Sequence, residues 1–279
     1  MRGILLFSLG VFCLSVMDAG AKWLTASYAV IQLIFFDSIF GTIPIAFQMR
    51  KEGLGVLRTP RWPWLCARGA LTICTIFFFF SALKYLPLAE VTIIFLIAPL
   101  LTVLLSAIFL KERISTAQLI AIAAGLLGAI LIIRPGTVSF ELVMLLPVAA
   151  ALSTALGLIA SKVLVRTESS SSVVAYELLV MFCASALIVP YYWVTPTLPD
   201  WPVIALVGIT GALGVYYRTA ACNYSPLNAI APLEYTGMVW AILFGFAIWG
   251  ELPDLWGWMG AVLIAAGGIY VARQHSETT

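Results

Sequence analysis

The sequence predicts an all-α integral membrane protein in which ten transmembrane helices form two inverted five-helix repeats around a central cavity. Three observations lead to this fold class: an apolar composition, ten long apolar segments and an internal repeat. Hydrophobic residues make up 62% of the 279 residues and charged residues only 10%. A soluble domain of this length could not bury so much apolar surface, so the lipid bilayer is the expected environment.

Apolar segments of about 20 residues, the length of helix that crosses a hydrocarbon core of roughly 30 Å, recur along the whole chain. The short breaks between them contain Gly, Pro and charged residues, which favour turns. The first segment also resembles a cleaved signal peptide, but its counterpart near 140–163 opens the second half, so we count both as the first helix of a repeat. The expected spans are 3–23, 30–49, 62–84, 87–110, 116–134, 140–163, 172–192, 201–222, 226–249 and 255–273.

The second half of the chain repeats the first at a spacing of 139 residues. Composition alone would match Leu and Ala at this spacing, but not so readily Trp, Tyr, Glu and Arg. We predict repeat one at 1–136 and repeat two at 137–279. Weak internal symmetry in an apolar chain is typical of transporters that hold a substrate between two repeats. The matched residues include Trp62-Pro63 with Trp201-Pro202, Tyr85 with Tyr224, Glu112 with Glu251, Gly128 with Gly267 and Arg134 with Arg273.

Lysine and arginine are distributed unevenly between the two sides of the predicted bundle. With a cytoplasmic N-terminus, 11 of them lie on the cytoplasmic side and 3 outside. The positive-inside rule therefore predicts that both termini are cytoplasmic, in a bacterial plasma (inner) membrane. Because each repeat has an odd number of helices, the second is inverted relative to the first. The net charge of +2 is too small to indicate a nucleic-acid partner.

Two charged pairs recur between the halves at a spacing of 140 residues. Lys22 and Asp37 correspond to Lys162 and Glu177, so a base ends the first helix and an acid lies in the second helix of each repeat. Two interpretations stay open: an ion pair that joins adjacent helices within a repeat, or a gate or proton-coupling acid. Asp18, one turn before Lys22, can join the outer cluster.

Glu234 lies in the ninth span, where an ionisable residue is costly and usually faces a cavity. Pro232 removes a backbone donor two residues earlier and loosens the helix. The repeat counterpart of Glu234 is Phe95, which suggests a task that only one half performs. The alternative is a structural pair with Arg218 in the eighth span.

Aromatic residues occur at matching places in the third and eighth spans, where Phe77 to Phe80 align with Tyr216-Tyr217-Arg218-Thr219. Only one or two of four successive residues can face a cavity. Tyr216 and Tyr217 are better candidates than the phenylalanines, among which we include Phe78, because a buried hydroxyl needs a polar partner. Arg68 is expected to snorkel to the inner surface, without a role in substrate binding.

The sequence contains no pattern that indicates a cofactor or a metal. The five cysteines fall in apolar segments without paired spacing, so we interpret them as packing residues. There is no phosphate-binding loop, His-Glu-x-x-His zinc pattern or Gly-x-Ser-x-Gly nucleophile elbow. An enzyme is therefore not expected, although a membrane-embedded enzyme and a channel remain alternatives to a transporter. A monomer is compatible with this arrangement.

The chain resembles the EamA-type members of the drug/metabolite transporter superfamily, and among them bacterial exporters of aromatic and neutral amino acids. The resemblance covers essentially the whole chain and depends on Ala98-Pro99 before Glu112 and on Leu233-Glu234-Tyr235 before Gly250-Glu251, together with the Arg134-Pro135-Gly136 junction. Met238 departs from the pattern, because it takes the place of Pro99 in the second repeat.

The resemblance implies a central cavity lined by helices one to four and six to nine, with helices five and ten outside. It also implies export of small metabolites, most often amino acids, by alternating access. We expect Glu234 to meet the substrate ammonium group. Nucleotide sugars or other organic anions are the alternative cargo, and proton coupling stays open because Asp18, Asp37, Glu177 and Glu234 are all candidates. The expected cavity residues are Glu234, Tyr235, Met238, Tyr216, Tyr217, Arg218, Phe78, Phe95, Pro99 and Ser153.

Overall fold

The computed structural model describes residues 2–53, 58–109, 116–133, 142–225 and 230–276, and no residue in these ranges belongs to a β-strand. Each predicted span contains helix, so the all-α membrane fold is confirmed. In the first half the helices are α1 Arg2–Thr25, α2 Val30–Glu52, α3 Trp62–Leu83, α4 Leu88–Phe95, α5 Ala98–Phe109 and α6 Thr116–Ile133. In the second half they are η2 Leu142–Met144, α7 Leu145–Leu164, α8 Ser170–Ile188, η3 Val189–Tyr192, η4 Leu198–Asp200, α9 Trp201–Tyr224, η5 Ala231–Tyr235, α11 Thr236–Trp249 and α12 Leu255–Ser276.

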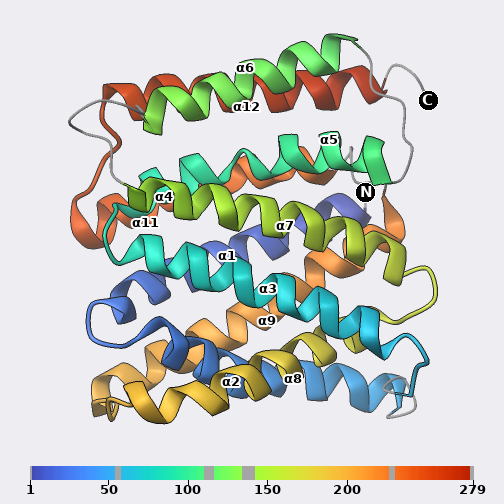
Figure 1. Cartoon of the computed structure of the whole chain (residues 1–279), viewed down its shortest axis with the longest axis vertical. Coiled ribbons are helices and arrows are strands. Elements are labelled where there is room, and N and C mark those ends of the chain that lie inside the picture. Colours follow the sequence, from blue (N-terminus) through green and yellow to red (C-terminus); the bar gives the residue numbers. More distant parts are fainter. Residues whose placement is uncertain (1, 54–57, 110–115, 134–141, 226–229, 277–279) are drawn as a thin grey trace.

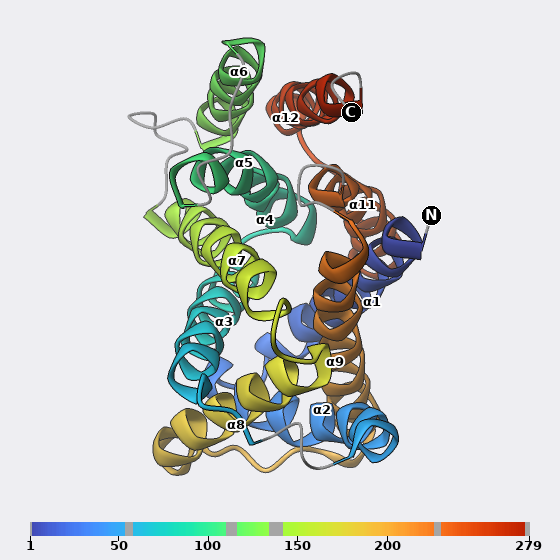
Figure 2. The ribbon, with the colours of Figure 1, turned by 90° about the vertical axis from the view of Figure 1, so that its right-hand side faces the viewer.

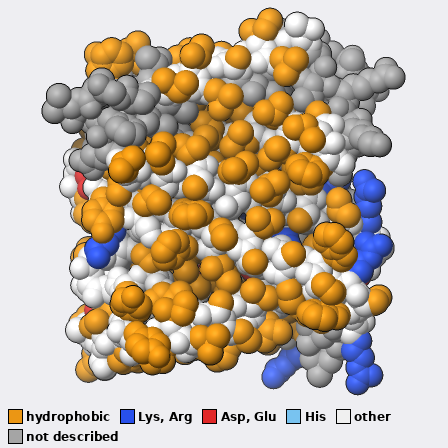
Figure 3. Space-filling model, in the orientation of Figure 1, with side chains coloured by type: hydrophobic (Ala, Val, Ile, Leu, Met, Phe, Trp, Pro, Cys, Tyr) orange, Lys and Arg blue, Asp and Glu red, His pale blue; other side chains and the backbone are white. Residues whose placement is uncertain are grey.

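The length and apolarity of these helices make the chain a multi-pass membrane protein. Among the described residues, 7 helical spans are long and apolar enough to cross a membrane, and shorter apolar helices run from Leu233 to Trp249 and from Leu255 to Ala266. Large apolar side chains are exposed along these helices, and they cover the face of the molecule in Figure 3. Such a surface is stable against lipid tails rather than water.

The fourth helix of each repeat is interrupted, and the two interruptions fall at equivalent positions. The first lies at Leu96 and Ile97, between α4 and α5, and Pro99 cannot donate a backbone hydrogen bond across it. The second lies between Tyr235 and Thr236, where the 3-10 helix η5 gives way to α11. These positions match at the repeat spacing of 139 residues. Glu234 therefore lies at a break in its span rather than within a continuous helix, and the geometry persists although Met238 replaces proline.

The helices form two walls that are related by exchange of the two halves of the chain (Figure 2). We call α1, α9 and α11 the first wall, and α3, α7 and α4 with α5 the second wall. In the first wall α1 packs on α9 and α11, whereas in the second α7 packs on α3 and α5. Helices α2 and α8 contact each other and connect the walls, and α6 and α12 pair outside them (Figure 1). The two halves of the chain therefore make corresponding contacts: α1 with α9 corresponds to α7 with α3, and α1 with α11 corresponds to α7 with α5.

Close approach of α1 and α9 depends on glycine. A Cβ atom on Gly214 would lie 2.6 Å from Cγ of Leu14 and 3.0 Å from the carbonyl oxygen of Gly10. Without side chains at these positions the backbones come into contact, as is common between membrane helices. The first wall is therefore a tightly packed unit.

The two ends of the bundle differ in charge. Helix α1 begins and α12 ends at the right-hand side of Figure 1, which we call the terminal face; the other end is the opposite face. Lysine and arginine side chains gather mainly at the terminal face (Figure 3). Since consecutive spans alternate in direction, α2, α7 and α9 end at the terminal face, and α1, α3 and α11 end at the opposite face.

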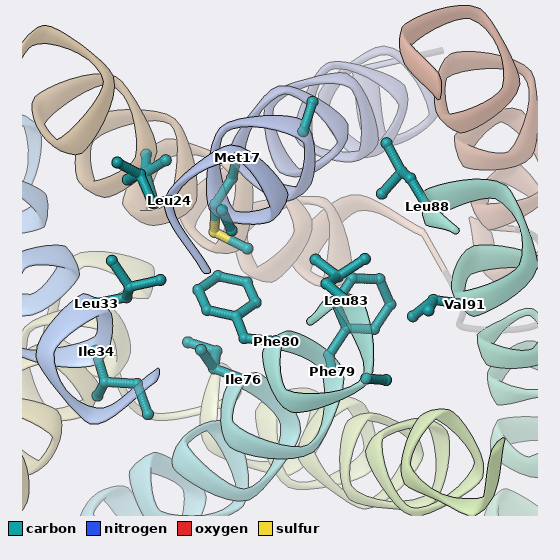
Figure 4. Packing of buried hydrophobic residues seen from close by; sticks show 14 of the residues in the cluster. Met17, Leu24, Leu33, Ile34, Ile76, Phe79, Phe80, Leu83, Leu88 and Val91 are labelled. Carbon is teal, nitrogen blue, oxygen red and sulfur yellow. The ribbon is translucent and has the colours of Figure 1, made fainter. Parts of the chain in front are cut away.

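A buried apolar cluster joins the helices toward the opposite face. Figure 4 shows Met17 and Leu24 of α1 packed with Leu33 of α2, Phe80 of α3 and Leu88 of α4. A smaller cluster toward the terminal face contains Phe7, Val11, Ile159, Ala221, Cys222 and Ile230. The space between the walls is therefore bounded by apolar side chains at both ends.

Candidate functional site

A cavity of about 120 Å³ lies between the two walls. Its lining residues come from α1, α2, α3, α4, α7, α8, α9, η5 and α11, and none of those described comes from α6 or α12. This is the set of helices that the sequence resemblance implies. The polar lining residues are Ser15, Asp18, Asp37, Arg68, Thr72, Thr75, Thr92, Ser153, Thr154, Glu177, Arg218, Thr219 and Glu234.

Arg68 of α3 forms a buried ion pair with Glu177 of α8. Its guanidinium also donates to Ser161 of α7, with 3.0 Å between Nε and Oγ, and to Thr72 one turn along α3. Burial of a charge in a membrane protein is tolerable only with such partners. This network holds the second wall to α8.

Arg218 of α9 forms the other buried ion pair, with Glu234 of η5. The guanidinium carbon lies 5.4 Å from the centre of the Phe7 ring of α1. Nε of Arg218 is buried and has no hydrogen-bond partner among the described residues. This pair with Arg218 is the structural alternative that the sequence left open for Glu234, and it leaves the Nε donor of Arg218 without a partner in the described ranges.

The two arginines lie at similar depth, near the terminal face. Arg68 is six residues from Trp62, where α3 begins, and Arg218 is six residues from Tyr224, where α9 ends. At 1.5 Å per residue both are roughly 9 Å inside the bundle. Although α3 and α9 are equivalent helices, the arginines are not repeat counterparts, because α3 and α9 run in opposite directions.

Asp18 and Asp37 lie nearer the opposite face and form no ion pair with a described residue. Asp18 is seven residues before Thr25, the end of α1, and Asp37 is seven residues after Val30, the start of α2. The Asp37 side chain is buried, and its Oδ1 atom has no hydrogen-bond partner. A Cβ atom on Gly211 of α9 would lie only 2.9 Å from this oxygen, so glycine makes room for the carboxylate.

Aromatic and hydroxyl side chains complete the lining. The rings of Phe79 and Phe95 meet edge to face, with 5.1 Å between their centres. The hydroxyls of Thr75 and Thr154 lie 3.2 Å apart and connect α3 to α7. Ser153 lines the cavity and donates to the carbonyl of Ala149. The cavity thus offers both apolar contact and hydrogen bonding.

Four of the ten predicted cavity residues line it: Glu234, Arg218, Phe95 and Ser153. The others lie outside the lining, among the residues that the structure describes. Tyr216 contacts the Tyr217 ring and packs against a separate apolar cluster. Phe78 packs on the cluster of Figure 4. Tyr235, Met238 and Pro99 are in the packing around α5 and α11. Four successive aromatic residues cannot all face one side of a helix, and in α3 it is Phe79 and Phe80 that line this cavity.

The lysines do not pair with the acids that the sequence suggested. Lys22 forms its ion pair with Glu251 instead of Asp37. Nζ of Lys162 donates to the carbonyls of Cys222 and Ser225, at 2.7 and 3.0 Å, while Glu177 pairs with Arg68. Depth explains the difference, because each lysine lies within one turn of a helix end whereas each acid is about two turns inside the bundle. Glu112 lies outside the described residues.

Arg68 is the site residue that sequence reasoning missed, because snorkelling to the surface was expected of it. The signal was present in the spacing. Arg68 is six residues from the start of α3 and Glu177 seven residues from the start of α8, and both helices begin at the terminal face. Matching opposite charges by depth would have found this pair.

Comparison with known proteins identifies the family of this chain. The model of the EamA-like transporter family matches residues 1–134 and again residues 141–273. The chain belongs to the EamA-like transporter family. The resemblance inferred from the sequence is therefore confirmed.

Relatives across this family are named as transporters of different small molecules. The chain is 30% identical to the pseudopaline exporter of Pseudomonas aeruginosa, over 97% of this chain and 96% of that protein. It is 28% identical to the S-adenosylmethionine uptake transporter of Rickettsia bellii, over 99% and 94%. A solved crystal structure superimposes with a TM-score of 0.76 over 98% of both chains, at 24% identity, which shows the shared fold.

Proposed function

We propose that this EamA-family protein exports amino acids or similar small metabolites by alternating access, with the cavity between the two walls as the substrate site. The observation that carries the proposal is the position of this cavity. It lies where the walls meet and where both fourth helices are interrupted, next to Phe95 and Glu234. Interrupted helices at a repeat interface are the usual substrate sites of secondary transporters.

The charges of the cavity favour a substrate with a positive group. Four carboxylates line it, from Asp18, Asp37, Glu177 and Glu234, against the guanidinium groups of Arg68 and Arg218. Nucleotide sugars and other organic anions need several basic residues that are free to meet phosphate or carboxylate. Since each arginine is already paired with a glutamate, an anion without a compensating cation fits this site poorly.

The charge at the terminal face supports a cytoplasmic position for both termini, in the plasma membrane of a bacterium. Repeat one, residues 1–136, and repeat two, residues 137–279, would then have opposite orientations. The relatives include both an exporter and an uptake transporter, so family membership leaves the direction to experiment. We assign export because the P. aeruginosa exporter has the higher identity of these two relatives.

The walls are the moving parts of the proposed cycle. Contacts at the terminal face and at the opposite face both join one wall to the other, and each set must open in turn. Lys22 and Glu251 contribute to the contact at the opposite face, and Lys162 contributes to the one at the terminal face. No energy source is built into this cycle, and a proton gradient can act through the cavity carboxylates.

Transport by the purified protein in liposomes tests the proposal. Radiolabelled L-phenylalanine, L-leucine, L-threonine and L-lysine are offered with and without a pH gradient, beside a nucleotide sugar. We expect saturable, stereoselective counterflow of at least one amino acid and none of the nucleotide sugar. Unsaturable flux would indicate a channel, and the absence of flux for every amino acid would reject this substrate class.

A further inference from the structure

Three residues that line the cavity have a buried polar atom without a hydrogen-bond partner in the described part of the chain: Asp37, Thr92 and Arg218. Oδ1 of Asp37 is an acceptor and Nε of Arg218 is a donor, whereas the hydroxyl of Thr92 can be either. Buried polar groups are nearly always satisfied, because an orphaned atom costs free energy. Oδ1 of Asp37 and Nε of Arg218 therefore indicate a ligand that supplies a donor to the first and an acceptor to the second.

We propose that the cavity binds a zwitterion in one orientation, with its ammonium group on Asp37 toward the opposite face and its carboxylate on Nε of Arg218 toward the terminal face. This inference rests on the proposed function and assigns the two ends of the substrate. It differs from the sequence-based expectation that Glu234 receives the ammonium group, because the carboxylate of Glu234 is already occupied by Arg218.

The surroundings of Asp37 suit a cation. The side chain is 3% exposed and has no cationic partner among the described residues, and the carboxylate of Glu177 acts on it from α8. Asp18 lines the same cavity from α1 and adds a second carboxylate at a similar depth. Uncompensated carboxylates in a membrane interior attract a positive group strongly. Glu177 itself is paired with Arg68, so the cavity carboxyl groups without an ion-pair partner among the described residues are those of Asp18 and Asp37.

The surroundings of Arg218 suit a carboxylate. One side of the guanidinium meets Glu234 and its carbon lies near the Phe7 ring, whereas Nε stays free. A guanidinium can bind two anionic groups at once through different edges of its fork. Glu234 therefore holds Arg218 in position while Nε meets the substrate.

The depths of the two groups set the orientation. Asp37 is seven residues after Val30, where α2 begins at the opposite face. Arg218 is six residues before Tyr224, where α9 ends at the terminal face. Gly211, which faces Oδ1 of Asp37, precedes Arg218 by seven residues in α9, so the two levels lie roughly 10 Å apart at 1.5 Å per residue. The apolar substituent of the substrate would contact Phe79, Phe80 and Phe95, which line the cavity toward the opposite face.

Binding of three related ligands to the purified full-length protein tests the two ends separately. L-phenylalanine has both charged groups, phenethylamine only the ammonium group and 3-phenylpropionate only the carboxylate. We expect the wild-type protein to bind L-phenylalanine at least tenfold more tightly than either analogue. An analogue that binds as tightly as L-phenylalanine overturns the assignment of the group it lacks.

Two variants give opposite patterns if the assignment is correct. Asp37→Asn should lower the binding affinity for L-phenylalanine and for phenethylamine at least tenfold. The affinity for 3-phenylpropionate should stay within threefold of the wild-type value. Arg218→Lys keeps the charge beside Glu234 but removes Nε. It should therefore lower the binding affinity for L-phenylalanine and 3-phenylpropionate and leave the affinity for phenethylamine unchanged. Equal weakening of all three ligands by either variant, or no weakening at all, overturns the proposal.

Gly211→Ala tests the geometry without removing a charge. Its Cβ would lie 2.9 Å from Oδ1 of Asp37 and 2.6 Å from Sδ of Met17, so the carboxylate must shift. We expect the ammonium-bearing ligands to bind several-fold more weakly. Gly245→Ala in α11 is the matched control, because its Cβ would meet nothing closer than 3.6 Å and it does not line the cavity.

The binding assay separates this inference from the proposed function. Absence of amino-acid flux in liposomes, together with Asp37-dependent binding of phenethylamine, would reject amino-acid export but keep the cation site. Amino-acid flux that is unchanged in Asp37→Asn and Arg218→Lys would keep the function and reject the site. A wild-type protein that binds none of the three ligands, nor L-leucine and its two corresponding analogues, overturns the proposal.

Discussion

The ammonium group of Lys22 and the carboxylate of Glu251 form an ion pair that joins the last turn of α1 to the segment after α11 at the opposite face. The same carboxylate oxygen accepts a hydrogen bond from the backbone N–H of Leu88, at 3.3 Å, where α4 begins. One carboxylate therefore links the first wall to the second. The Lys22 ammonium also lies 4.8 Å from the centre of the Trp249 ring, which further fixes its position.

Glu251→Gln should weaken closure of the opposite face. The amide cannot form the ion pair, and the bond from the Leu88 N–H, which joins the walls, then ends on a neutral oxygen. A hydrogen bond to a charged group contributes about 1.5–3 kcal/mol, against about 0.5–1.5 kcal/mol for a neutral one. A loss of about 1.4 kcal/mol shifts the opening equilibrium tenfold. We expect a cysteine placed at Ser15, in a background without native cysteines, to react roughly tenfold faster with a membrane-impermeant thiol reagent added at the opposite face.

The matched control for this labelling is Glu168→Gln, which changes a carboxylate to an amide outside the cavity. Glu168 accepts a hydrogen bond from Thr59 in the loops at the terminal face. If labelling is also faster in Glu168→Gln, the faster labelling of Glu251→Gln would reflect a general loosening of the helix bundle rather than opening of the opposite face. Unchanged labelling in Glu251→Gln would show that the ion pair does not hold this face closed.

Gly214→Ala should destabilise the first wall. The added methyl group meets Leu14 at 2.6 Å and the Gly10 backbone at 3.0 Å, and a backbone atom cannot move aside without separating α1 from α9. Overpacking typically costs about 1–3 kcal/mol. We expect a thermal midpoint several degrees lower in detergent, whereas Gly245→Ala should leave the midpoint unchanged or raise it slightly. Equal midpoints for the two variants would contradict the close helix contact.

Lys162→Met should weaken closure of the terminal face. Its ammonium group donates to two carbonyls around the end of α9, Cys222 and Ser225, where the helix dipole is negative. A cation at this end contributes about 0.3–1 kcal/mol at exposed sites and up to ~2 kcal/mol when partly buried. The reactivity of a cysteine at Gly157 in the cavity, probed from the terminal face, should rise several-fold. Lys162→Arg should retain most of the closure. If both variants raise the reactivity equally, the positive charge of Lys162 is not what holds the terminal face closed.

The sequence predicted the fold more completely than the site, for physical reasons. Hydrophobic length determines membrane spans, so each predicted span contains helix. The repeat spacing predicted that Phe95 and Glu234 are counterparts, and the structure places both beside helix breaks. Ion pairs depend on which side chains meet across helices that are distant in sequence. The sequence therefore suggested Lys22 with Asp37, whereas Lys22 reaches Glu251 near the surface and Asp37 stays unpaired. Arg68 and Glu177 could be matched by their depths, six and seven residues from the starts of α3 and α8, but not by the repeat spacing, because they are not counterparts of each other.

The pair of Arg68 and Glu177 allows a double-variant test of what a buried ion pair contributes. Arg68→Met leaves the Glu177 carboxylate buried without its partner, which typically costs about 3–5 kcal/mol. Replacement of both residues by methionine removes both charges, and such replacements are often neutral or stabilising. We expect Arg68→Met and Glu177→Met each to lower the thermal midpoint by several degrees, and the double variant to recover most of that loss.

The recovery separates a structural contribution from a functional one. If the pair serves only to join α3 to α8, the double variant should regain transport along with stability. We expect transport to stay low, because Arg68 and Glu177 also line the cavity and the carboxylate of Glu177 acts on Asp37. Unfolding curves and liposome flux measured on the same preparations give both quantities. A double variant that regains stability and full flux would limit the pair to a structural role, and one that regains neither would indicate that Ser161 and Thr72 hold the network together.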